Sequence, residues 1–316
     1  MKKAIAFLLA VVMVFALCAC GKTSAAELKY ATGGTSGTYY GFSGVIANVL
    51  NEKLKDTLNL KVESTGASKA NIQMLASGDA DIAIVQNDVM YYAYTGTDLF
   101  AGGDPITGFS AVCSCYPEYV QILAKKDIKS VEQLAGKNVS VGDAGSGTEF
   151  NAKQILGAYN LTFDDINVSN QSFADSADAL KNGTIDAAFV VAGYPTTAVT
   201  ELATNFDFNL LAIDDAHAAK LRNDYGFYYY GVIPGGTYKP VPGDVPAVAV
   251  MATIVASNKV SADAVYAFVK GLFDYKADIT AGHVKGNELD LSTAVSGVSI
   301  PWHPGAEKFY KEKGVL

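Results

Sequence analysis

The tripeptide Ser-Gly-Thr occurs twice in this chain, once beginning at Ser36 and once at Ser146. Each copy follows a short apolar run typical of a strand and precedes a segment whose apolar residues have helical spacing. The first turn of a helix carries backbone N–H groups with no partner inside the helix, at the positive end of the helix dipole. Such a turn can bind a carboxylate or another anion. The two loops therefore predict two lobes that face one small anionic ligand.

Further polar residues are expected near these loops, because ligands of open α/β sheets bind beyond the carboxyl ends of the strands. Some belong to the two loops and to a similar loop at 64–68, and others follow the apolar runs at 82–85 and 185–191. The predicted ligand contacts are Thr35, Ser36, Gly37, Thr38, Tyr39, Thr65, Gly66, Ser68, Gln86, Asn87, Ser146, Gly147, Thr148, Gly193 and Pro195.

Some of these residues have a purely structural alternative. Ser146 and Glu149 have the spacing of a capping box, in which the two side chains satisfy the first N–H groups of their own helix. Capping uses one N–H group and leaves others for a ligand, so both roles can coexist. Tyr39 could equally be a packing residue with a hydrogen-bonded hydroxyl.

The sequence lacks the patterns that catalysis or metal binding requires. Its three histidines, His217, His283 and His303, are far apart, and neither His-Glu-x-x-His nor Gly-x-Ser-x-Gly occurs. Neither Ser-Gly-Thr loop contains the Gly-Lys-Ser/Thr of a phosphate-binding loop. Cys113 and Cys115 are two apart on a strand-like segment and are expected to be small buried side chains. We predict a protein that is not an enzyme, with no cofactor and no metal site.

The charge of the chain limits its partners. A formal net charge of −8 argues against nucleic acid and against electrostatic attraction to anionic lipid. The chain has a single arginine, Arg222, so an arginine fork for an anion has one candidate. Helix N-termini and hydroxyl groups are therefore expected to hold a bound anion.

The beginning of the chain is typical of a signal peptide. Lys2 and Lys3 precede an apolar run at 4–16 that is too short to span a bilayer. The segment Leu-Cys-Ala-Cys-Gly at 17–21 resembles a bacterial lipobox; an ordinary signal peptide with an incidental cysteine is the alternative. We expect a signal peptide at 1–19, a lipidated Cys20 that begins a tether over 20–26, and an extracytoplasmic protein anchored in the membrane by its lipid.

Strand-like and helix-like segments alternate along the rest of the chain, which favours an α/β fold. Leu-x-x-Gly-x-x-Asp-x-Ala occurs at 75–83 and again at 180–188, so the two halves repeat one order of elements. The chain is expected to cross between lobes within 109–124 and again within 213–230. The predicted division is a discontinuous first lobe, 27–120 plus 226–316, and a second lobe, 121–225.

Several motifs together resemble a known family. They include Ala-Thr-Gly-Gly-Thr-Ser-Gly-Thr-Tyr-Tyr at 31–40, Ser-Thr-Gly-Ala-Ser at 64–68, Gly-Ser-Gly-Thr-Glu at 145–149 and Ile-Pro-Trp-His-Pro-Gly-Ala at 300–306. In order and spacing the chain resembles the TAXI-type solute receptors of TRAP transporters. The resemblance implies a type II periplasmic-binding-protein fold, with two α/β lobes joined by a hinge around a ligand cleft. It also implies glutamate or a related carboxylate as ligand, and the small and large TRAP membrane subunits as partners.

Two other functions are compatible with the same features. A substrate-binding lipoprotein of an ABC importer, or the ligand-binding module of a sensor, would have the same lobes and loops. An enzyme on this fold would need a nucleophile and a base, and the sequence offers no such pair.

Overall fold

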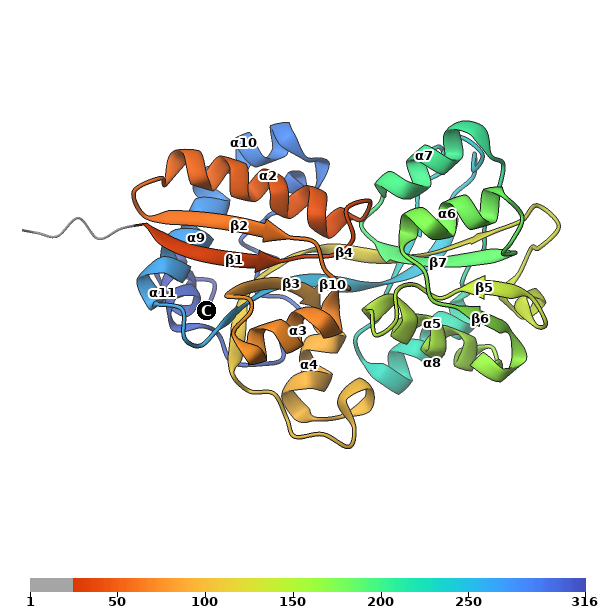
Figure 1. Ribbon diagram of the computed structural model, residues 1–316, viewed down its shortest axis with the longest axis horizontal. Coiled ribbons are helices and arrows are strands. Elements are labelled where there is room, and N and C mark those ends of the chain that lie inside the picture. Colours follow the sequence, from red (N-terminus) through yellow and green to blue (C-terminus); the bar gives the residue numbers. More distant parts are fainter. Residues whose placement is uncertain (1–24) are drawn as a thin grey trace, which may run out of the picture.

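The computed structural model describes residues 25–316, so the predicted signal peptide and the predicted lipidation site Cys20 lie outside the described residues (Figure 1). Strands and helices alternate as the sequence predicts. The strands are β1 (Ala26–Ala31), β2 (Leu58–Glu63), β3 (Ile82–Gln86), β4 (Phe109–Ala124), β5 (Asn138–Ser140), β6 (Asn167–Ser169), β7 (Ala187–Ala192), β8 (Asn209–Leu210), β9 (Tyr229–Ile233) and β10 (Val245–Ser257). The helices are α2 (Thr38–Lys53), α3 (Ser68–Ser77), α4 (Asn87–Thr95), α5 (Gly147–Ala158), α6 (Phe173–Lys181), α7 (Thr197–Asn205), α8 (Asp215–Tyr225), α9 (Ala262–Asp274), α10 (Lys276–Gly282) and α11 (Pro304–Lys313).

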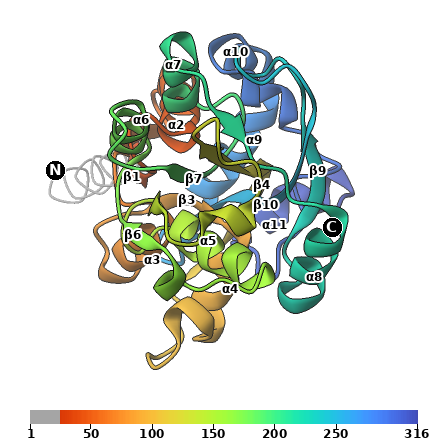
Figure 2. The same ribbon diagram turned by 90° about the vertical axis from the view of Figure 1, so that its right-hand side faces the viewer.

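The main strands form one mixed sheet in the order β2-β1-β3-β10-β4-β7-β5-β6. Strands β1, β2 and β3 are parallel at one end, β5, β6 and β7 are parallel at the other, and β4 and β10 run antiparallel between them. Helices lie on both sides of the strands, with α2, α6 and α7 above and α3, α4 and α5 below in Figure 2. The inner strands β3 and β7 are buried along their whole length, as parallel strands covered on both faces are.

The long strands β4 and β10 belong to both ends of the molecule. Figure 1 shows two groups of helices separated along the long axis, with these two strands running between them. Val112 of β4 and Ile254 of β10 pack in a core of the first lobe, whereas Ile122 and Val248 pack in a core of the second. The change of lobe occurs near Met251, which pairs with Pro117.

This packing shifts one of the expected lobe limits. The sequence places 226–316 in the first lobe, but Tyr228, Ile233, Tyr238 and Val248 pack in cores of the second. The reason is that β10 is apolar on both sides of Met251, so its sequence carries no mark of the change of lobe. The return crossing falls near 251, and the division into lobes is proposed with that limit.

The repeated helix–glycine–strand motif has the same geometry in both lobes. Gly78 ends α3 with φ +88°, and Gly183 follows α6 with φ +79°, a conformation that glycine adopts without strain. Asp81 and Asp186 each accept a hydrogen bond of 2.9 Å from a backbone N–H, that of Lys29 in the first lobe and of Asn138 in the second. The two aspartates therefore tie each turn to the neighbouring strand.

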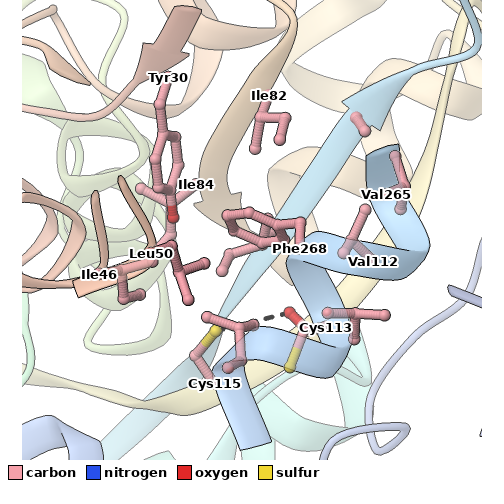
Figure 3. Packing of buried hydrophobic residues seen from close by; sticks show 14 of the residues in the cluster. Tyr30, Ile46, Leu50, Ile82, Ile84, Val112, Cys113, Cys115, Val265 and Phe268 are labelled. Atoms are coloured by element: carbon pink, nitrogen blue, oxygen red, sulfur yellow. Dashed lines mark hydrogen bonds between the residues drawn. The ribbon is translucent and has the colours of Figure 1, made fainter. Parts of the chain in front are cut away.

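The largest core lies between β1, β3, β4 and the helices α2 and α9 (Figure 3). Tyr30 and Phe268 meet edge to face there, with ring centroids 6.1 Å apart and an interplanar angle of 86°. Cys113 and Cys115 are buried free thiols in the same cluster, which confirms their expected packing role.

Replacing Phe268 with Ala should lower the free energy of unfolding by about 3–5 kcal/mol, because its ring is fully buried and closes the first-lobe core. Urea denaturation measures the change. Val284→Ala serves as the control, since Val284 is 50% exposed and should shift stability by less than about 0.5 kcal/mol. Equal effects of the two substitutions would contradict the assignment of this core.

Candidate ligand-binding cleft

A pocket lies between the two lobes, with about 530 Å³ of empty space, part of it open to solvent. Most of its walls come from loops and helix starts at the carboxyl ends of strands in both lobes, and Glu118 of β4 with Val191 and Ala192 of β7 completes the lining. The lining residues are Gly33, Gly34, Ser36, Gly37, Thr38, Tyr39, Ala67, Ser68, Gln86, Glu118, Asp143, Ser146, Gly147, Thr148, Phe173, Val191 and Ala192.

Four helices begin at this pocket. Helices α2 and α3 start at Thr38 and Ser68 in the first lobe, and α5 and α6 start at Gly147 and Phe173 in the second. This convergence follows from the fold, because in each lobe the parallel strands end at the cleft and a helix follows. The positive ends of four helix dipoles therefore point toward one small volume.

The four helix starts differ in how their N–H groups are used. Ser146 accepts a hydrogen bond from the Glu149 N–H at 3.1 Å, so the capping role expected for Ser146 is present while the residue also lines the pocket. Ser172 caps α6 in the same way. At Gly37 and Ala67, which precede α2 and α3, the described chain provides no side-chain cap. Of the four helices, α2 and α3 thus leave the most backbone N–H groups of the first turn for a ligand to bind.

Nine of the fifteen predicted ligand contacts line this pocket. They come from the first loop, from the start of α3, from the end of β3 and from the second loop. These residues are Ser36, Gly37, Thr38, Tyr39, Ser68, Gln86, Ser146, Gly147 and Thr148.

The other predicted contacts lie outside the lining and have structural roles nearby. Thr35 is exposed, and Gly66 belongs to the loop before α3. The Thr65 hydroxyl donates to the Thr32 carbonyl at 3.0 Å and accepts from the Ala67 N–H at 3.1 Å, which holds that loop. Asn87 accepts from the Met251 N–H at 2.9 Å, at the point where β10 changes lobe.

Gly193 and Pro195 lie behind the pocket, at the end of β7. The Gly193 carbonyl accepts a hydrogen bond of 2.8 Å from the Thr38 hydroxyl, which joins the second lobe to the start of α2. Pro195 follows a cis peptide bond in the turn toward α7. Neither residue lines the pocket, and Gly193 joins the two lobes through its bond with Thr38.

The sequence does not predict Glu118, Asp143, Phe173 or several small or apolar residues of the lining. Glu118 had a visible signal, because it is the one charged residue in the segment that forms β4. It is 2% exposed, and the Gln86 side-chain amide donates to its Oε2 at 3.3 Å. Asp143 lies in the loop before α5, and Phe173 is the first residue of α6. Their place in the pocket depends on how the two lobes meet, which the sequence does not show.

Burial raises the pKa of Glu118 to about 8. The Tyr39 hydroxyl, the Gln86 amide and the charge of Lys285 favour the ionised form, and the charge of Asp88 disfavours it. The Tyr39 hydroxyl is close to the carboxyl group, yet it completes no hydrogen bond within residues 25–316. A buried acid therefore stands at the base of a pocket whose walls favour anions.

The described lining contains no cationic side chain. Arg222 lies on the exposed face of α8, away from the pocket, so the arginine-fork alternative has no support from this geometry. Within residues 25–316, no group of three or more His, Cys, Asp or Glu residues is placed to hold a metal ion. None of the helices there is long and apolar enough to cross a membrane.

Residues 30–314 match the family described as NMT1-like. The alkanesulfonate-binding protein SsuA from Xanthomonas axonopodis pv. citri, bound to MOPS, is 16% identical, with 92% of this chain and 84% of that chain covered and a TM-score of 0.52. The periplasmic aliphatic sulphonate binding protein SsuA from Escherichia coli is also 16% identical, with 92% and 84% covered and a TM-score of 0.50. A protein from Bordetella bronchiseptica RB50 is 17% identical, with 91% and 82% covered and a TM-score of 0.54.

At these identities the similarity shows a shared fold, which confirms the expected two-lobed α/β fold of periplasmic binding proteins. The identification as a TAXI-type receptor of a TRAP transporter is wrong, because the match over nearly all of the described chain is to a different family description. The TRAP membrane subunits lose their basis as partners for the same reason. The chain belongs to the NMT1-like family.

Proposed function

We propose that this protein is an extracytoplasmic solute-binding protein, without enzymatic activity, that captures a small organic anion between its lobes. The first candidates are carboxylates such as glutamate and related amino acids. The observation that carries the proposal is the convergence of four helix N-termini on one pocket between the lobes. Backbone N–H groups at helix starts bind anions without a positively charged side chain, which suits an acidic chain with one distant arginine.

Contacts between the lobes support closure around a ligand. Besides the bond from Thr38 to Gly193, the Ala198 N–H donates to the Ser36 carbonyl at 3.2 Å. On the other side of the crossing strands, the Asn151 side chain donates to Asp88 at 2.9 Å. These bonds form when the lobes meet, so a ligand that fills the pocket stabilises the same arrangement that they do.

The importer that we propose as partner is of the ABC type, which is one of the two alternatives, beside a sensor module, that the sequence leaves once TRAP subunits are set aside. The solved structures of similar fold include periplasmic sulfonate-binding proteins, and a sulfonate is an anion that the same N–H groups could hold. Sulfonates therefore belong among the candidate ligands. We also propose that Cys20 carries the lipid that keeps the protein at the membrane.

Ligand binding should compact the protein and raise its melting temperature, because the ligand stabilises the closed lobes alone. Small-angle scattering and thermal unfolding would be measured with the twenty amino acids, with short carboxylic acids and with short alkanesulfonates. At least one compound should reduce the radius of gyration and raise Tm together. If the whole panel leaves both quantities unchanged, the proposed function is wrong.

Gly147→Ala should weaken ligand binding at least about tenfold, which corresponds to about 1.4 kcal/mol. A Cβ at Gly147 would stand 1.7 Å from the Gln86 Oε1 of the other lobe, so the added methyl group opposes closure. We expect the lobes of the ligand-free protein to stand apart without this contact, so stability should fall little or rise, since Ala favours helices over Gly. Isothermal titration calorimetry and urea denaturation measure the two effects.

Gly157→Ala is the matched control for this substitution. Gly157 lies in the same helix α5, is exposed, and a Cβ there meets nothing within 4 Å. The affinity of the Gly157→Ala variant for the ligand should equal that of the unmodified protein. Unchanged affinity in Gly147→Ala would mean that ligand binding does not require α5 to close against Gln86.

Cys20→Ser should release the protein from the membrane fraction and reduce solute uptake by intact cells, because the lipid is the proposed anchor. Uptake with the unmodified protein should stop when ATP is depleted while the ion gradients are maintained. Retention of the serine variant in the membrane would refute the anchor. Uptake that follows the ion gradient instead of ATP would refute the ABC partner.

A further inference from the structure

Glu118 is a buried acid without a cationic partner. It follows Pro117 in β4, lines the pocket and is 2% exposed. One carboxyl oxygen accepts the bond from Gln86. The other, Oε1, has no hydrogen-bond partner among residues 25–316, although the Tyr39 hydroxyl lies close to the carboxyl group. An unpartnered buried carboxylate is costly, so the group stays protonated unless a cation pairs with it.

The nearest lysine is engaged elsewhere. Lys285 lies in the 3-10 turn Val284–Glu288, and its ammonium group pairs with Glu288 at 2.5 Å. The same ammonium sits over the ring of Tyr194, 4.9 Å from its centre. No salt bridge within 4.0 Å links Glu118 to any lysine of the described chain. Lys285 acts on Glu118 through its charge without a direct contact, so a cation in contact with Glu118 would come from the pocket.

The acid and the anion-binding helix starts are close together, because Gln86 touches both. Its amide nitrogen donates to Glu118, and its amide oxygen lies against Gly147 at the start of α5. The amide oxygen of Gln86 also has no hydrogen-bond donor in the described part of the chain. The pocket thus offers helix N–H groups on one side and, beside them, two acceptor oxygens, Glu118 Oε1 and Gln86 Oε1.

We propose that Glu118 binds an ammonium group of the ligand, that the ligand is therefore a small zwitterion, and that Glu118 releases its proton to the solvent as the ammonium binds. An amino acid and an amino-sulfonic acid share this chemistry, with the acid group at the helix starts and the ammonium group at Glu118 and Gln86. The only bond that breaks is the O–H bond of the carboxyl group, and its proton passes to the buffer. This inference rests on the proposed function for the position of the ligand's acid group.

The groups that face Glu118 determine the pH range in which the effect is measurable. They are Tyr39 from α2, Asp88 from α4, Lys285 from the turn after α10, and Tyr116 and Cys115 from β4 itself. The pKa of Asp88 is raised to about 6 by burial, below that of Glu118, and the tyrosines and Cys115 titrate above their usual values. Between pH 7 and pH 8 the charge of Glu118 therefore changes, whereas the pKa of Asp88 lies below this range and the pKa values of Tyr39, Tyr116 and Cys115 are raised above it.

Isothermal titration calorimetry of the full chain at pH 7, in phosphate and in Tris, tests the proposal. Each amino acid and taurine would be paired with its deaminated counterpart, for example glutamate with glutarate and taurine with ethanesulfonate. The zwitterion should bind at least about 100-fold more tightly than its counterpart, because the counterpart leaves buried acceptors unpaired. Close to one proton should be released per ligand at pH 7, and the release should fall toward zero above pH 8, where Glu118 is already ionised.

Glu118→Gln should remove the proton release and most of the preference for the zwitterion, while binding of the deaminated counterpart stays within a few-fold. Glu132→Gln is the control, because Glu132 is exposed on the second lobe and should change neither quantity. If Glu118→Gln does not fold, the proton release of the unmodified protein, measured in phosphate and in Tris, still tests the proposal. Equal binding of the deaminated compounds without proton release overturns this inference and leaves the proposed function standing, whereas no binding by either set overturns both.

Discussion

Two long antiparallel strands, β4 and β10, are shared by both lobes, and the geometry of the cleft depends on them. Because each strand enters one core before Met251 and Pro117 and the other core after them, the parallel strands of the two lobes end toward the same space. A helix follows most of those strand ends, so several helix N-termini lie at the cleft as a consequence of the topology. The crossing strand also brings Glu118 into the cleft.

The electrostatics of the cleft come from the backbone rather than from charged side chains. The chain carries a net charge of −8, and the charged side chains in the described lining are the acids Glu118 and Asp143. Anion binding at such a site relies on N–H groups that are fixed in position by the helices. The helix starts therefore attract the anion, and the few polar side chains between them select among anions.

The alternation of strands and helices, the two lobes and the pocket position of the two Ser-Gly-Thr loops could be predicted from the sequence. Turn glycines and apolar periodicity, on which these predictions rest, are local signals. It also indicated the capping role of Ser146 beside its place in the pocket. The positions of Thr65, Asn87 and Gly193 behind the pocket were not predictable, since they depend on loop conformation and on which carbonyl each side chain reaches. The proposed lobe limit near Met251 has no signal in the sequence, because β10 is apolar throughout. The family was misassigned from a few short motifs, whereas the match that identifies it spans residues 30–314.

Hydrogen–deuterium exchange of the ligand-free and ligand-saturated protein tests the central claim most directly, because it reports on the backbone N–H groups that are said to bind the anion. We expect the ligand to protect the N–H groups in the first turns of α2, α3 and α5. It should also protect the Ala198 N–H of α7, which donates to the Ser36 carbonyl. Protection confined to other segments, such as α8 around Arg222, would contradict the account.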